Sequence, residues 1–309
     1  MKLLYLPLIY GGVNNEQKYL SRAFSSEFET RSYDYYNFQG KKDDELMRIV
    51  QTFKPDVIHG QFHGTSYIQP FSLAHIKLVY PHTVITQWIG DVRPEPTKEV
   101  IEYGKYCDIT FVVSQTDVEQ YKAAGVKDVQ YWQNAVSQEQ IGHPARSPKG
   151  IVFCGGGHYG HPLTPQRREL VQAFKDTFKE FKLYGPGWSE ETPTLQWDRQ
   201  TEIYEQCYLS VGHNQVDGKK HWFSDRSIIA MAAGRPHLFH YSEGMEELFE
   251  DMKEVVFWKT IPEAIEKAQW LLDNHKEATK IGKMGQKKIK EKYMWGNRVL
   301  EYKEAVSKY

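Results

Sequence analysis

The segment Phe223–Pro236 places polar, small and helix-ending residues in an order that suits phosphate binding. Ser224, Asp225 and Arg226 precede a run of small and apolar residues, and Gly234 then ends the predicted helix. Ser224 or Asp225 is expected to cap the helix, whose first N–H groups carry partial positive charge. Arg226 adds a cation beside that end, so the segment predicts a seat for a diphosphate. Taken alone, the pattern equally fits an ordinary capped helix of an α/β domain.

The composition indicates a folded chain of about two domains. Its 309 residues are 40% hydrophobic and 26% charged, which suffices for buried cores. The formal net charge of −1 gives no whole-molecule attraction for nucleic acid, although it leaves room for a local basic patch.

Cysteine usage and the first apolar run point to a cytoplasmic protein. Cys107, Cys154 and Cys207 are odd in number and far apart, which favours a reducing compartment. The apolar run at 3–9 is too short for a signal peptide or a membrane span, so we interpret it as a buried strand. We expect no membrane-spanning segment.

Short apolar runs alternate with amphipathic stretches, which is typical of parallel α/β units. In the first half, strands are predicted at 3–9, 30–35, 57–59, 83–88, 109–113 and 129–132, with helices at 43–52, 72–76, 97–103 and 116–124. The second half repeats the pattern, with strands at 151–154, 181–184, 209–212 and 238–240, and helices at 167–177 and 201–206. From 262 the chain is mostly helical, and its lysine-rich face is interpreted as a solvated surface.

Residues 134–150, which are rich in Asn, Ser, Gly and Pro, are the best candidate linker. The predicted domains are therefore 1–140, 150–290, and a closing helix at 291–309 that packs back on the first domain. Each domain starts with a strand and a glycine loop. The expected fold class is α/β, with two facing doubly wound, Rossmann-like domains and a cleft at the carboxyl ends of their strands.

Several ordered motifs carry a resemblance to a known family. They are Val152–Gly157 with Arg168, Leu183–Trp188, Tyr204–Asn214, Ser224–Gly234, Glu243–Phe249 and Tyr293–Arg298, together with Trp88–Arg93 and Cys107–Gly125 in the first half. The chain resembles GT-B glycosyltransferases, and its second half is similar to the CgeB-like (spore maturation protein-like) branch. The resemblance implies transfer of a sugar from a nucleotide-diphosphate sugar, with a UDP-sugar as the expected donor and no other cofactor.

The resemblance also implies different roles for the two domains. The donor nucleotide is expected in the second domain, and the acceptor mainly in the first. The fold usually needs no metal, and the sequence has no Asp-x-Asp pair. His59 and His63 are four apart, but they flank a strand end rather than share a helix face, so no metal site is expected there.

One position departs from the family pattern. Many relatives carry two glutamates eight positions apart, the second five residues before the glycine. Here His221 and Ile229 stand at those positions, and isoleucine cannot accept a hydrogen bond from a ribose hydroxyl. Asp225, Glu243 or Glu246 is the candidate replacement.

The donor site implied by the resemblance is built around Arg226, which would stabilise the leaving diphosphate. Arg168, or its neighbour Arg167, is the second candidate cation, and Lys219 and Lys220 are further candidates that could close over the phosphates. The complete set of expected donor-binding residues is Gly11, Gly12, Gly155, Gly156, Arg168, Tyr184, Asn214, Ser224, Arg226 and Gly244.

The acceptor hydroxyl must lose a proton in the reaction. Asp91 follows a predicted strand and is the first candidate for the general base, with His63 as the second. Alternatively, Asp91 pairs with Arg93 and shapes the loop, and a retaining enzyme needs no such base. His63, Trp88 and Arg93 are the expected acceptor contacts.

Other functions remain open from the sequence. A sugar-nucleotide epimerase on the same fold and a non-catalytic nucleotide-sugar or glycan-binding module are the alternatives. The acceptor is a cell-surface precursor, a small molecule, a protein or a modified DNA base, and we expect a monomer or a weak dimer. A strong salt dependence of binding would indicate DNA.

Overall fold

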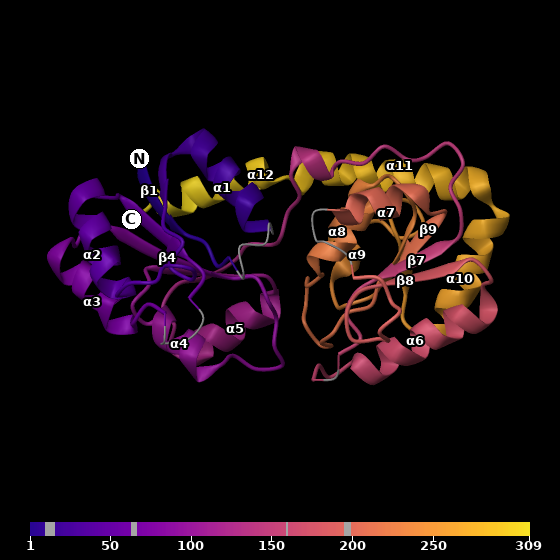
Figure 1. Cartoon of the computed structure of the whole chain (residues 1–309), viewed down its shortest axis with the longest axis horizontal. Coiled ribbons are helices and arrows are strands. Elements are labelled where there is room, and N and C mark those ends of the chain that lie inside the picture. The colour runs from indigo at the N-terminus through magenta and orange to yellow at the C-terminus, as the bar shows by residue number, and fades with distance from the viewer. Residues whose placement is uncertain (10–15, 63–66, 159, 195–198) are drawn as a thin grey trace. The chain divides into compact units, whose positions relative to one another are not determined.

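The computed structural model describes residues 1–9, 16–62, 67–158, 160–194 and 199–309. The chain forms two compact units. The first contains 1–133 and 295–309, and the second contains 134–294. Both chain termini therefore belong to the first unit (Figure 1).

The first unit is built on a six-stranded sheet in which every described pairing is parallel. Its strands are β1 (Lys2–Leu6), β2 (Glu29–Ser32), β3 (Val57–Gly60), β4 (Val84–Ile89), β5 (Ile109–Val112) and β6 (Val129–Tyr131), in the order β2-β1-β3-β4-β5-β6. Residues of β1, β3, β4 and β5 are almost entirely buried, as expected for strands covered on both faces.

Six helices cover this sheet: α1 (Glu16–Glu27), α2 (Lys42–Phe53), α3 (Pro70–Val79), α4 (Lys98–Gly104), α5 (Gln115–Ala123) and α12 (Trp295–Val306). Figure 1 shows α1 and α12 on one side of the sheet and α4 and α5 on the other. The last helix is held by Tyr302, whose hydroxyl lies 2.8 Å from Thr86 Oγ1, and by Trp132, whose Nε1 donates to Arg298 O at 2.9 Å. The closing segment of the chain thus packs on the first unit.

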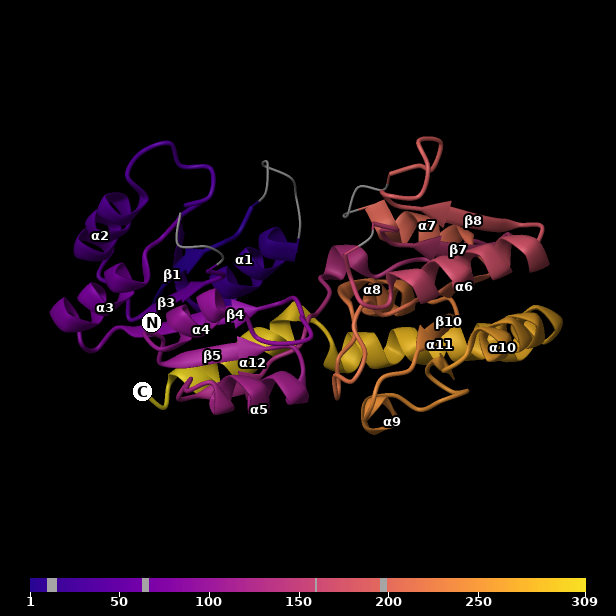
Figure 2. The same ribbon diagram turned by 90° about the horizontal axis from the view of Figure 1, so that it is seen from below.

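The second unit has a five-stranded parallel sheet in the order β11-β10-β9-β7-β8. The strands are β7 (Ile151–Cys154), β8 (Phe181–Tyr184), β9 (Leu209–Val211), β10 (His237–His240) and β11 (Val256–Trp258). The helices are α6 (Thr164–Thr177), α7 (Gln200–Gln206), α8 (Asp225–Ala232), α9 (Met245–Leu248), α10 (Ile261–Asp273) and α11 (His275–Lys292), with a short 3₁₀ helix, η2 (Gln138–Gln140). Figure 1 shows α7 and α8 on one side of this sheet and α6 and α10 on the other, and Figure 2 shows α6 running alongside β8.

The strand order places a topological switch point between β7 and β9. From β7 the chain moves outward to β8, and it then crosses back to β9 on the opposite side of β7. The loops that follow β7 and β9 therefore leave the carboxyl ends of these two strands in opposite directions. Open α/β sheets bind ligands at such a point.

The stretch 134–150, expected as a linker, packs on the second unit. The Val136 N–H donates to Tyr293 O at 2.9 Å, and the Gly142 N–H donates to Ala232 O at 3.0 Å. Backbone bonds to α8 and to the end of α11 therefore order a segment whose composition resembles that of a loop.

Candidate functional site

The glycine loop after β7 is held against the loop after β8. The Gly155 N–H donates to Tyr184 O and the Gly157 N–H to Pro186 O, both at 2.9 Å. A Cβ at Gly157 would lie 2.5 Å from the Trp188 ring, so this position requires glycine. A Cβ at Gly156 would meet no atom closer than 3.7 Å, which leaves one side of the loop open to a ligand.

Arg168 supports this loop. Its Nη2 donates to Gly157 O at 2.8 Å and to Gly187 O at 2.6 Å. Its guanidinium lies 5.2 Å from the centre of the Trp188 ring. Two loop carbonyls and an indole thus engage its planar group, and donor binding by Arg168 stays a prediction.

Arg167 spans the switch point, although the sequence suggested it only as a neighbour of Arg168. Its side chain is 1% exposed, and it donates to Gly156 O at 2.9 Å and to His213 O at 2.6 Å. Burial, with a smaller contribution from Arg226, lowers the pKa of the guanidinium to about 9, so it stays protonated at neutral pH. Arg167 thus joins the loops after β7 and β9 and carries a buried positive charge between them.

The first turn of α8 approaches the same glycine loop. Ser224 occupies the N-cap position with extended backbone, but its side chain makes no capping hydrogen bond, contrary to the expectation from the sequence. Arg226 Nε lies 3.7 Å from the position that a Cβ on Gly155 would occupy. The Arg226 side chain is 29% exposed, and its Nη1 is 3.7 Å from Asp225 Oδ1, a loose contact. The structure thus brings together Gly155, Ser224 and Arg226.

Tyr184 lies at the edge of this cluster. It ends β8, directly beside Cys154 of β7, and its ring packs partly buried against the core under α8. Burial, and then the neighbouring Cys154, raise the pKa of the Tyr184 hydroxyl. Tyr184 is therefore neutral and partly accessible beside Gly155.

Asn214 has a structural role in the loop after β9. Its Nδ2 donates to His240 O at 3.1 Å and to Ser242 Oγ at 3.2 Å, and the residue is buried. These bonds tie the ends of β9 and β10 together. Its amide nitrogen is engaged by the protein, and the donor contact expected for Asn214 stays a prediction.

A stacked histidine pair beside Asn214 was not predicted from the sequence. The rings of His213 and His240 lie 4.4 Å apart, and the His240 ring is 4.4 Å from that of Trp258. Burial is the main cause that lowers the pKa of His213 to about 2 and that of His240 to about 4. Both rings are neutral near pH 7. The available signal was that each histidine ends or directly follows one of two adjacent strands.

The loop before α8 is fastened to α9. Lys220 Nζ and His221 Nε2 lie 3.1 Å and 3.0 Å from the two carboxylate oxygens of Glu247. A Cβ on Gly244 would come within 2.6 Å of the His221 ring, so this loop covers one side of Gly244, and the expected donor contact stays a prediction. Lys219 is 2% exposed, which places its side chain inside the fold.

Ile229, at the second glutamate position of the family pattern, is buried in the core under α8. An isoleucine there packs against apolar side chains and offers no polar group to a nucleoside. The structure therefore has no carboxylate at this position, as the sequence already indicated.

The expected acceptor residues fall in different environments. Trp88 is 1% exposed and packs edge-on against Trp132 and Trp295, so its ring lies in the core of the first unit, and its acceptor contact stays a prediction. Asp91 and Arg93 are exposed in the loop that follows β4. In the described part of the chain they form no ion pair with each other. Gly11, Gly12 and His63 lie outside the described residues.

The described residues contain no group of three or more His, Cys, Asp or Glu side chains that could hold a metal ion. His59 is fully buried, and its Nδ1 lies 2.8 Å from Thr86 Oγ1 in the core of the first unit. It therefore serves the packing of the first unit. Among the described helices, none has the length and apolar character needed to cross a membrane.

Comparisons with known proteins bear on the family and the fold of the chain. Residues 166–304 match the family model described as glycosyl transferase-like. A search of curated protein sequences gave no match. The glycosyltransferase prediction is confirmed, whereas the CgeB-like branch stays a prediction.

Solved glycosyltransferase structures share the fold over the whole chain. HepE from Anabaena, in complex with UDP and glucose, aligns with a TM-score of 0.72 at 12% identity, covering 100% of both chains. Sucrose-phosphate synthase from Thermosynechococcus elongatus aligns at 0.69 and 10% identity, covering 100% of this chain and 99% of that one. A glycosyltransferase from Rickettsia africae gives 0.62 at 11% identity, with 99% and 97% covered. At identities this low the structural likeness shows the fold alone, and the predicted GT-B fold class is confirmed.

Proposed function

We propose that this glycosyltransferase takes its sugar from a nucleotide-diphosphate donor whose diphosphate binds between the β7 loop and the start of α8. The observation that carries the proposal is the approach of Arg226 to Gly155 at the carboxyl edge of the second sheet. An open glycine loop, a helix N-terminus and a cation meet there, and each favours a phosphate.

The negative charge of the leaving diphosphate determines which residues of the site would act in the reaction. When the bond between the anomeric carbon and the diphosphate oxygen breaks, negative charge grows on the leaving group. Arg226 is partly exposed and can meet that charge directly, whereas Arg167 is buried and acts through the loop carbonyls that it holds. Asp225 adds negative charge in the first turn of α8, so the cation of Arg226 is the main attraction for an anion there.

UDP is the nucleotide that we propose, because HepE, with which the whole chain aligns, was crystallised with UDP and with UDP-glucose. Tyr184, beside Gly155, is the aromatic side chain that we propose to contact the donor. The buried Ile229 supplies no carboxylate for the ribose, so we propose that the ribose hydroxyls are bound by Glu243 or Glu246, or by the backbone.

Asp91 is the residue that we propose as base for the acceptor hydroxyl. It is exposed in the loop after β4, at the carboxyl edge of the first sheet. The acceptor oxygen would form the new bond to the anomeric carbon, its proton would pass to the Asp91 carboxylate, and the nucleoside diphosphate would leave.

The lysines of α11 give little support to a DNA acceptor. Lys280, Lys287 and Lys288 lie within 3.7, 3.8 and 3.4 Å of glutamate carboxylates. The pairs of Lys280 and Lys287 are exposed, as is typical of a solvated helix face, whereas the Lys288–Glu254 pair is partly buried. We therefore place the acceptor among non-nucleic-acid molecules.

The test is incubation of the protein with a panel of nucleotide sugars, with and without acceptors, followed by separation of the products. We expect UDP release from one UDP-sugar and a glycosylated product. An altered sugar nucleotide without UDP release would indicate an epimerase. Tight UDP-sugar binding with no turnover would indicate a binding module.

A further inference from the structure

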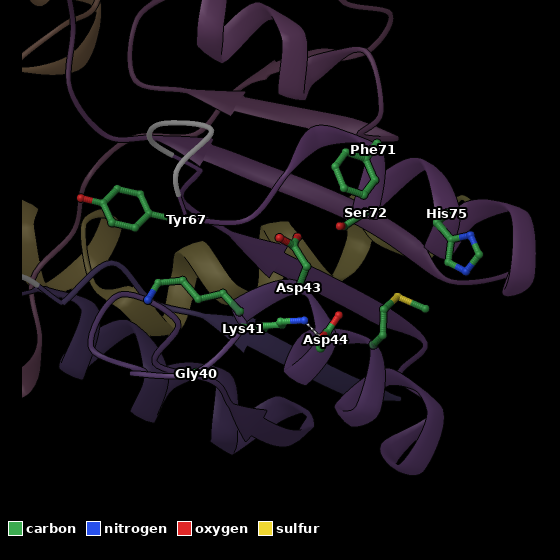
Figure 3. Close-up of a pocket in the computed structure, with 10 residues that line it drawn as sticks. Gly40, Lys41, Asp43, Asp44, Tyr67, Phe71, Ser72 and His75 are labelled. Carbon is green, nitrogen blue, oxygen red and sulfur yellow. Dashed lines mark ion pairs between the residues drawn. The ribbon is translucent and has the colours of Figure 1, made fainter.

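A cavity in the first unit lies apart from the residues assigned above. Its volume is about 710 Å³, and it is lined by residues 40–44 and 47 at the start of α2 and by residues 67, 71, 72 and 75 at the start of α3. This size falls in the range of small-molecule sites. Figure 3 shows side chains from both helices around the same hollow.

The cavity sits at the edge of the sheet where acceptors are expected. The loops that lead into α2 and α3 follow β2 and β3, and Asp91 follows β4. All of these strands are parallel, so the cavity and Asp91 share the carboxyl edge of one sheet. Three strand spacings separate β2 from β4, which is about 14 Å.

The lining combines an exposed aromatic ring with polar groups. Phe71 is 66% exposed at the start of α3, an unusual position for a large apolar side chain, and Tyr67 is half-buried nearby. Asp43 Oδ1 accepts the Gln69 N–H at 2.9 Å, which ties the start of α2 to the start of α3. The wall that carries Asp43 and Phe71 is therefore fixed before any ligand arrives.

The charges of the lining cancel. Lys41 and Lys42 balance Asp43 and Asp44, and Lys41 Nζ lies 3.9 Å from Asp44 Oδ2. A cavity of zero net charge does not favour a polyanion such as DNA. An aromatic face with hydrogen-bonding carboxylate, hydroxyl and imidazole groups suits a ligand with apolar C–H faces and many hydroxyls.

We infer that this cavity binds a neutral saccharide unit of the acceptor, at a distance from the hydroxyl that reacts. The acceptor is then an oligosaccharide long enough to reach from the cavity to the Asp91 loop. The inference rests on the proposed function only in calling the bound saccharide an acceptor.

The experiment is ligand-observed NMR of the whole chain with maltotriose, cellotriose and chitotriose, with no donor present. At least one trisaccharide should bind, and Phe71→Ala should weaken its affinity about tenfold. The matched control is Leu78→Ala on the same helix, because Leu78 is 78% exposed and lies outside the cavity. His75→Ala provides a second variant within the cavity, and melting temperatures verify that each variant is folded.

Failure of the inference and failure of the proposed function are distinguishable by titrating UDP in parallel. UDP binding with no trisaccharide binding would overturn the cavity assignment alone, as would an unchanged affinity in Phe71→Ala. Trisaccharide binding without UDP binding would support the cavity and contradict the donor site. A short DNA duplex that binds in place of the trisaccharides and loses affinity in Phe71→Ala would also overturn the inference.

Discussion

Arg226 Nε lies 3.7 Å from the point where a Cβ on Gly155 would stand. The glycine follows β7 and the arginine belongs to the first turn of α8, so two separate elements of the second sheet's carboxyl edge meet there. This contact connects the open loop to the cation that a diphosphate requires. The predictions on the donor site depend on it.

Gly156→Ala and Gly157→Ala form a matched pair with opposite expectations. A Cβ at Gly157 collides with Trp188, so that variant should lose about 1–3 kcal/mol of unfolding free energy. A Cβ at Gly156 has room, so its stability should change by less than about 0.5 kcal/mol while UDP affinity falls, because the methyl group occupies the ligand side. Chemical denaturation and calorimetric titration measure the two effects. Unchanged UDP affinity in Gly156→Ala would show that the diphosphate binds elsewhere.

Arg168→Ala should act on stability. The variant loses donors to Gly157 O and Gly187 O and the stacking on Trp188, which should cost about 1–3 kcal/mol of unfolding free energy. If denaturation showed no loss while UDP affinity fell steeply, Arg168 would belong to the donor site after all.

Asp91→Asn tests the proposed base. The kcat for transfer should fall by about 100-fold or more, whereas UDP affinity should stay the same, because Asp91 belongs to the other unit from the donor site. Steady-state kinetics with the acceptor gives the result. A kcat equal to that of the wild type would remove Asp91 from catalysis and would fit a retaining reaction.

Acid should destabilise the protein through its buried histidines. Burial lowers the pKa of His59 and His237 to about 3, of His240 to about 4 and of His213 to about 2. Between these values and about 6.5 the unfolded chain binds protons that the folded chain does not, so the free energy of unfolding falls as the pH drops below about 6.5.

Each of these histidines contributes a slope of about 1.4 kcal/mol per pH unit in that window. When the protein unfolds at pH 5.5, these four histidines together should therefore bind about three to four protons from the solvent. Calorimetry in buffers of different ionisation enthalpy measures this proton uptake. Proton uptake near zero would mean that the histidines are charged in the folded protein.

The sequence predicted the elements of the site better than the orientation of its side chains. The strand at 151–154 and the glycines after it were expected where the structure has them, because apolar periodicity and glycine loops are local signals. Arg167 and Arg168 are neighbours on one helix. Only the packing shows that Arg167 spans the switch point and that Arg168 stacks on Trp188. Trp88 was expected to contact the acceptor, and the sequence could not show that Trp295 of α12, far along the chain, packs against its ring.

Other features depended on contacts between distant segments. The stretch 134–150 has the composition of a linker, yet its backbone bonds to α8 and to the end of α11. The strand β11 was not predicted, and its pairing with β10 became evident only from the fold. The His213–His240 stack required the strand order, which brings β9 beside β10.

The donor site is tested most directly by calorimetric titration of UDP into the wild type, Arg226→Gln and Arg146→Gln. Arg146 is an exposed arginine of the same unit and serves as the matched control. Arg226→Gln should weaken UDP binding by about 10- to 100-fold with little change in melting temperature, while Arg146→Gln binds as the wild type does. Equal UDP affinity in all three proteins would contradict the assignment of the diphosphate to Arg226.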